Sequence, residues 1–156
     1  MSSQARMLRH GRRIEILVLE DDDQLAATLK DVLESCSYQV TTVQNGVQGL
    51  RCIMAEEFDL VLCDMVMPTF PGDKFYIAVE RVKPALCRRF LFMTGHRVKL
   101  EYDFFMRNIG GFMLWKPFET RELLAAIQAV FSRAQQLDVA EWSRTLPGAR
   151  GPRRQL

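Results

Sequence analysis

Apolar residues along the chain gather in five short runs, and polar or turn-forming residues separate them. The runs are Ile14 to Leu19, Gln39 to Val43, Leu60 to Cys63, Phe90 to Met93 and Phe112 to Trp115. Short, largely apolar runs between turn formers are typical of strands that a parallel sheet buries on both faces. The pattern therefore predicts five strands.

Each predicted strand is followed by apolar residues at helical spacing. The inward faces that this spacing predicts are Leu25, Leu29, Val32 and Leu33; Val47, Leu50 and Met54; Phe75, Ala78, Val79 and Val82; Leu100 and Phe104; and Leu123, Leu124, Ile127, Val130 and Phe131. Strands that alternate with helices imply right-handed crossovers and a parallel sheet covered on both faces. The expected fold class is α/β.

The composition is that of an ordinary soluble domain. The chain has 156 residues, of which 48% are hydrophobic and 26% charged, enough for one domain with a sizeable core. No apolar run has the length of a membrane span, and the N-terminus lacks the apolar centre of a secretory signal. The four cysteines form no C-x-x-C pair, so we expect reduced thiols. A cytoplasmic protein without a membrane contact is expected.

Charge divides the chain into three parts. Residues 1–13 carry four arginines and no acid, residues 14–135 carry 13 basic and 17 acidic residues, and residues 136–156 carry four arginines and two acids. We expect a basic N-terminal extension, one globular domain and a flexible basic C-terminal tail, because the helical pattern fades after about Gln136. Any contact of these ends with DNA would be salt-sensitive and without sequence specificity.

Polar side chains stand at the ends of four predicted strands. Glu20-Asp21 follow the first, Asp64 the third, Thr94 the fourth and Lys116 the fifth. Each alone could be a helix cap or a turn residue. In a doubly wound parallel sheet, however, these ends share one crevice. Three carboxylates that lie together repel one another and require a cation, and their hard oxygen atoms suit Mg²⁺.

These residues stand in recognisable motifs. They are ILVLEDD (Ile16 to Asp22), D-x-x-M-P-x-x-x-G from Asp64 to Gly72, Thr94-Gly95 and Lys116-Pro117-Phe118. Over residues 14–135 the sequence resembles the receiver domain of two-component response regulators. The resemblance implies a doubly wound, flavodoxin-like sheet of five parallel strands in the order 2-1-3-4-5, with five flanking helices.

The resemblance also implies a role for each strand-end residue. Asp64 would accept a phosphoryl group from a sensor histidine kinase or a histidine phosphotransfer protein, in a signalling role rather than as an enzyme. Mg²⁺ would be held by Glu20, Asp21, Asp64 and the backbone carbonyl of Val66. Thr94 and Lys116 would contact phosphoryl oxygens, and the Lys116-Pro117 bond would be cis.

Some positions depart from the family pattern or stay open. Met113 stands where the family usually has an aromatic switch residue. Either the coupling between this position and Thr94 is altered, or Phe112 takes the place of the aromatic residue. Simple strand packing is the favoured interpretation of Phe112, Met113 and Trp115. Val66 and His96 occupy positions that tune phosphoryl lifetime in the family, and a plain loop residue is the alternative for His96.

A contact surface is expected near the fourth helix, at about Val98 to Arg107. If Leu100 and Phe104 face inward, some of Tyr102, Phe105 and Met106 are exposed. Receivers use the fourth helix, fifth strand and fifth helix for dimerisation or output docking, so a homodimer through this face is one expected use.

Three other functions compete with a phosphoacceptor. A phosphorylation-independent interaction module of the same fold would lack a usable acidic pocket. A phosphohydrolase with an aspartyl intermediate would place its nucleophile after the first strand in a D-x-D pattern. A nucleotide- or flavin-binding domain would have a phosphate loop where this chain has Glu20 and Asp21, and acids repel phosphate unless a metal intervenes.

Overall fold

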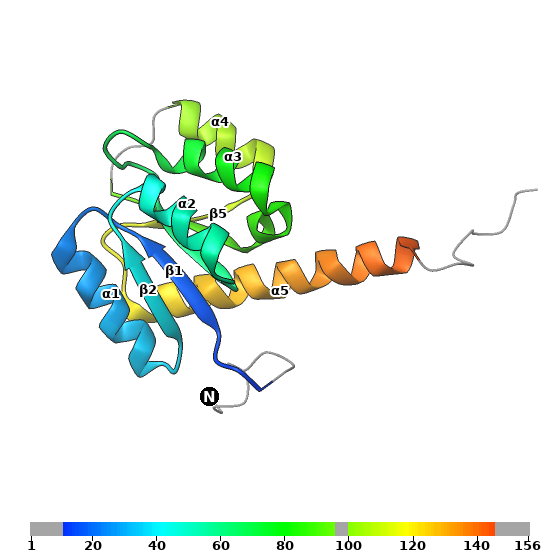
Figure 1. The fold of residues 1–156 in the computed structure, drawn as a ribbon, viewed down its shortest axis with the longest axis horizontal. Coiled ribbons are helices and arrows are strands. Elements are labelled where there is room, and N and C mark those ends of the chain that lie inside the picture. Colours follow the sequence, from blue (N-terminus) through cyan, green and yellow to red (C-terminus); the bar gives the residue numbers. More distant parts are fainter. Residues whose placement is uncertain (1–10, 96–99, 146–156) are drawn as a thin grey trace, which may run out of the picture.

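The structure is a computed structural model, and it describes residues 11–95 and 100–145. Its centre is a parallel sheet in the order β2-β1-β3-β4-β5, which confirms the expected α/β fold and strand order. Figure 1 shows the strands side by side between helices. The strands are β1 (Glu15–Leu19), β2 (Gln39–Val43), β3 (Leu60–Asp64), β4 (Phe90–Thr94) and β5 (Phe112–Trp115).

Among the described residues, four helices and one short 3₁₀ segment connect the strands, and a fifth helix follows β5. They are α1 (Asp23–Ser35), α2 (Gly46–Ala55), α3 (Gly72–Val82), η2 (Pro84–Arg89), α4 (Leu100–Ile109) and α5 (Thr120–Thr145). Local chemistry sets where two of them begin: the Asp22 carboxylate accepts from the first turn of α1, and the Asn45 side chain accepts from the N–H of Gln48 in α2.

The sheet separates two hydrophobic cores. Helices α1 and α5 cover one face, and α2, α3 and α4 cover the other (Figure 1). Ile127 and Val130 of α5 are completely buried in the first core, as Phe75 and Val79 of α3 are in the second. All five residues of β3 are buried, so the middle of the sheet is a rigid base for side chains at its carboxyl edge.

The inward face of α2 differs from the prediction at two of its three residues, while Leu50 packs against the second core as predicted. Val47 and Met54 are 56% and 68% exposed, whereas Gly46, Gly49 and Ile53 are buried. A Cβ at Gly49 would lie 2.7 Å from a methyl carbon of Leu19. The helix approaches β1 closely at Gly49, and a glycine adds nothing to an apolar stripe.

The inward face of α4 is also not the predicted one. Leu100 and Phe104 are 87% and 68% exposed, while Tyr102, Phe105 and Met106 are partly buried against the second core. At about 100° per residue the two stripes lie on opposite sides of the helix, and the side with Tyr102, Phe105 and Met106 has more apolar area to bury.

The C-terminal helix is longer than expected. Helix α5 continues to Thr145 rather than fading at Gln136. Arg88 of η2 pairs with Asp138 and Glu141 at 2.9 and 2.8 Å, so acids that looked like part of a solvated tail hold the helix against the domain. Residues 1–10 and 146–156, on which the other expectations for the two ends fall, lie outside the described residues.

Two smaller findings concern cysteines and membranes. The four cysteines, all within the described residues, form no disulfide. None of the helices within residues 11–95 and 100–145 is long and apolar enough to cross a membrane.

Candidate functional site

The strand-end residues meet at the carboxyl edge of the sheet. Glu20, Asp64 and Thr94 are 1%, 5% and 1% exposed at the ends of β1, β3 and β4, and Asp21 next to them is exposed. Because β1 pairs with β2 on one side and β3 on the other, these ends flank the switch point of the sheet. The predicted convergence of these residues is confirmed.

Lys116 ties two of the acids together. Its ammonium lies 2.6 Å from Glu20 Oε2 and 2.8 Å from Asp64 Oδ2. Its backbone N–H donates to the Thr94 carbonyl at 2.8 Å, which fixes the start of the side chain beside β4. Burial, the largest single influence, lowers the pKa of Lys116, but hydrogen bonds to Asp64 and Glu20 together outweigh it and raise that pKa. Lys116 is therefore a permanent cation. The Lys116-Pro117 bond is cis, as the resemblance implied.

Backbone groups orient both buried carboxylates. The Val66 N–H donates to Asp64 Oδ1 at 2.9 Å, and the Asp22 N–H donates to Glu20 Oε1 at 3.1 Å. Burial raises the pKa of Glu20 above its usual value, and the hydrogen bond from Lys116 opposes that rise. Asp64 thus holds one oxygen on a backbone amide and the other on an ammonium.

The three acids fit a divalent cation. One oxygen from each of Glu20, Asp21 and Asp64 can lie within 4.8 Å of the other two. Three carboxylates against the single charge of Lys116 leave an excess of negative charge, and carboxylate oxygens are the ligands that Mg²⁺ prefers. The carbonyl of Val66 as a fourth protein ligand stays a prediction from the resemblance.

Gly72 supports the site in a way that the strand-end pattern did not reveal. A Cβ on Gly72 would lie 2.7 Å from the Asp64 carbonyl oxygen and 2.9 Å from the Met65 Cα, both backbone atoms that cannot swing away. Its N–H donates to the Met65 carbonyl at 3.0 Å. Gly72 lets the start of α3 pack directly beneath the loop that carries Asp64. The signal was present as the glycine of the D-x-x-M-P-x-x-x-G motif.

The strand before Lys116 packs on both sides. Phe112 is partly buried against the first core with the Arg133 guanidinium 5.6 Å from its ring centre, and Met113 is partly buried against the second core. Trp115 is 54% exposed, so the interpretation of this residue as a packed strand residue is wrong. His96 lies outside the described residues.

The fold and the site together describe a parallel α/β sheet with a lysine-bridged acidic pocket at its switch point. The family model of the response regulator receiver domain matches residues 16–128. The chain belongs to that family.

Similar proteins agree with this assignment. The response regulator receiver protein CpdR of Brucella abortus is 32% identical over 120 residues, which are 76% of this chain and 98% of that protein. The transcriptional regulatory protein GltR of Pseudomonas aeruginosa is 27% identical over 129 residues, which are 83% of this chain and 52% of GltR. The chain thus spans about half the length of the first curated relatives that it matches.

Solved structures give the same fold. A CheY-like receiver domain protein from Methanospirillum hungatei superposes with a TM-score of 0.72 at 26% identity, over 80% of this chain and 98% of that one. A structure described as an adenylate cyclase from Rhodopirellula baltica superposes with a TM-score of 0.73 at 28% identity, over 85% of this chain and 98% of that one.

Proposed function

We propose that Asp64 accepts a phosphoryl group from the phosphohistidine of a sensor histidine kinase or a histidine phosphotransfer protein. The observation that carries this proposal is the arrangement at Asp64: a nearly buried carboxylate 2.8 Å from the ammonium of Lys116, within 4.8 Å of the Glu20 and Asp21 carboxylates. The protein then acts as a signalling phosphoacceptor rather than as an enzyme that releases a product.

Each side chain has a physical task in the transfer. An Asp64 oxygen forms the new bond to phosphorus, the phosphorus–nitrogen bond of the phosphohistidine breaks, and its electron pair stays on the histidine nitrogen. The Val66 N–H holds the Asp64 carboxylate in one orientation, which preorganises the attack. Lys116, whose ammonium lies 2.8 Å from Asp64 Oδ2, would pair with a phosphoryl oxygen.

Glu20, Asp21, Asp64 and the Val66 carbonyl would hold Mg²⁺, which when bound neutralises negative charge on the phosphoryl oxygens. The protein's own contribution is to keep these oxygens together. The Lys116 ammonium binds one oxygen of Glu20 and the Asp22 N–H donates to the other, so both oxygens of this carboxylate are held in position.

Phosphorylation would reach partner proteins through β4, β5 and α4. The new group adds roughly −1.5 to −2 of charge beside Lys116 and the Thr94 hydroxyl. Leu100 and Phe104 of α4 and Trp115 of β5 are exposed apolar side chains next to these elements. In this proposal they form the output face, where a second copy or another protein binds. They replace Tyr102 and Phe105, which pack inward.

Intact-mass spectrometry with acetyl phosphate and Mg²⁺ tests the acceptor. We expect a gain of one phosphoryl mass, lost with hydroxylamine as for an acyl phosphate, and absent without Mg²⁺ or in Asp64→Asn. Asp23→Asn is the matched control, since this exposed acid begins α1 two residues after Asp21 and lies outside the cluster of three. If neither acetyl phosphate nor a phosphorylated histidine kinase labels the wild type, the chain is a phosphorylation-independent module instead.

A further inference from the structure

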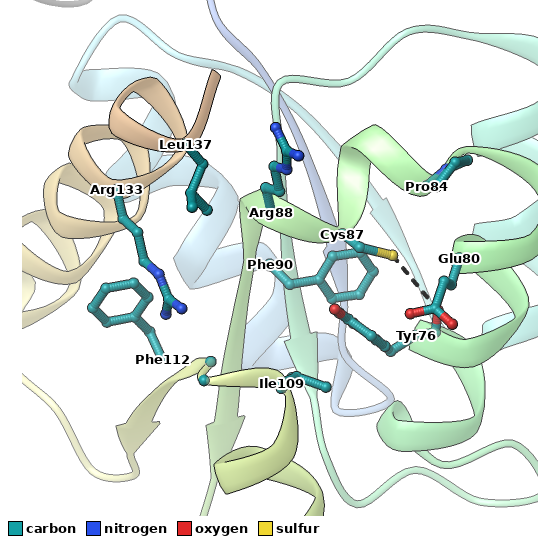
Figure 2. A pocket seen from close by; sticks show the side chains of 12 residues that line it. Tyr76, Glu80, Pro84, Cys87, Arg88, Phe90, Ile109, Phe112, Arg133 and Leu137 are labelled. Atoms are coloured by element: carbon teal, nitrogen blue, oxygen red, sulfur yellow. Dashed lines mark hydrogen bonds between the residues drawn. The ribbon is translucent and has the colours of Figure 1, made fainter. Parts of the chain in front are cut away.

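A second hollow lies at the opposite end of the sheet from Asp64. It has a volume of about 250 Å³ and is walled by α3, η2, the end of α4, the start of β5 and α5 (Figure 2). Phe90 and Phe112, the first residues of β4 and β5, line it, whereas Thr94 ends β4. Five residues of strand, about 15 Å, separate the two sites.

One wall of this pocket carries an unpaired guanidinium. Arg133 of α5 lies over the Phe112 ring, and it makes no ion pair with any described residue. By contrast Arg88, which also lines the pocket, is bound to Asp138 and Glu141. The ring holds the guanidinium by a cation–π contact and leaves its N–H edge available.

The backbone beside Arg133 is shaped to admit it. Gly110 has a φ of +59°, and a Cβ there would lie 2.7 Å from Arg133 Nη2. The glycine thus serves both the left-handed turn after α4 and the close approach of the guanidinium. A side chain at this position would push Arg133 out of the place it occupies.

The other walls are largely apolar, with polar groups facing Arg133. Phe90, Ile109 and Leu137 supply carbon surface, and Figure 2 shows Tyr76 and Glu80 on the side opposite Arg133. The Glu80 carboxylate disfavours a second negative group at that end and favours a hydrogen-bond donor.

We propose that this pocket binds a small organic monocarboxylate with a flat apolar body, its carboxylate on Arg133 and a donor group toward Glu80. An Arg edge pairs with a carboxylate through two parallel N–H bonds. The volume lies just below the roughly 300 Å³ at which pockets for drug-sized ligands begin, so the ligand is about the size of one aromatic ring with its substituents.

The test is a titration of ¹⁵N-labelled full-length protein with 4-hydroxybenzoate, followed by NMR. We expect saturable shifts at Gly110, Gly111 and Phe112 and at the Arg133 side chain. The neutral analogue 4-hydroxybenzamide has the same shape, and we expect it to bind about tenfold more weakly because it cannot form the charged pair. Asp64→Asn should bind 4-hydroxybenzoate like the wild type.

Two variants and one matched control locate the binding. Arg133→Gln and the pocket-filling Leu137→Trp should each abolish the shifts, while Arg144→Gln, an exposed arginine farther along the same helix, should bind like the wild type. Circular dichroism of each variant verifies folding. Equal affinity for the acid and the amide, unchanged binding by folded Arg133→Gln, shifts centred on Lys116, or no saturable shift would each overturn the proposal.

Discussion

Helices α4 and α5 flank the same edge strand, β5, yet they are attached to the domain in different ways. Helix α5 places four residues in the core, of which Leu123, Ile127 and Val130 are at most 1% exposed. Helix α4 has no buried residue and touches the core through half-buried side chains such as Tyr102 and Phe105. Its exposed side bears Leu100 and Phe104.

The contrast shows where the domain can change shape at low cost. Moving α5 would expose fully buried aliphatic groups, each worth roughly 1.5–3 kcal/mol. Moving α4 breaks fewer contacts, and elements that move in switching come from the weakly held part of a structure. The β4 and β5 ends that carry Thr94 and Lys116 thus adjoin one firmly and one loosely attached helix.

The largest expected difference is between aliphatic truncations in the two helices. Ile127→Ala in α5 should lower the free energy of unfolding by about 3 kcal/mol, since Ile127 is fully buried and leaves a cavity. Leu100→Ala in α4 should change it by less than about 0.5 kcal/mol, because Leu100 is 87% exposed. Urea unfolding measures both, and similar losses would contradict the contrast.

An aromatic truncation inside α4 should have an intermediate effect. The Phe105 ring meets Tyr76 and Phe92 edge-on, with centroids 5.4 and 5.8 Å apart. Phe105→Ala should cost about 2 kcal/mol and speed amide exchange in α4 more than in α5. Phe104→Ala, one position away and 68% exposed, is the control that should leave both unchanged.

Loss of the ion pairs between Arg88 and the C-terminal part of α5 should have a smaller effect on stability. Arg88→Ala removes ion pairs to Asp138 and Glu141 that are partly exposed, so global stability should fall by less than about 1 kcal/mol. Hydrogen exchange should speed up after Leu137 and stay slow around Ile127. If exchange at Ile127 rises equally, the extension and the packed part of α5 are one cooperative unit.

The last expected effect appears only in alkali. Burial raises the pKa of Tyr76 to about 12 from a usual value of 10, so the folded state holds this proton more tightly than the unfolded state. The corresponding stability is complete below pH 10 and is lost as the pH rises from 10 to 12. The urea midpoint of Tyr76→Phe should therefore fall less over that window than that of the wild type, and equal falls would contradict the assignment.

The sequence predicted best where one physical signal dominated. The stripe of α5 is correct at Leu123, Ile127 and Val130, because aliphatic residues recur there without a competing stripe. In α4 apolar stripes on two opposite sides of the helix fit the same period, and only packing against Tyr76 and Phe92 decides between them. In α2 the buried face runs through Gly46 and Gly49, which carry no hydrophobic signal.

The candidate site was more predictable than the pocket at the other end. Topology alone brings the ends of β1, β3, β4 and β5 to one edge, so Glu20, Asp64 and Lys116 had to meet. The pocket around Arg133 depends on how η2, α4 and α5 pack, and on a turn at Gly110 whose φ is positive. No spacing along the chain encodes that packing.

The unbroken length of α5 has a mechanical consequence. From Ala134, the last buried residue of the helix, to its end at Thr145 the axis runs about 16 Å at 1.5 Å per residue. Figure 1 shows this part reaching beyond the sheet. If this part of the helix stays straight, a tilt of about 5° at Ala134 moves its end by roughly 1.4 Å. A small rotation of α5 within the domain therefore moves the end of the helix at Thr145 farther than any other part of it.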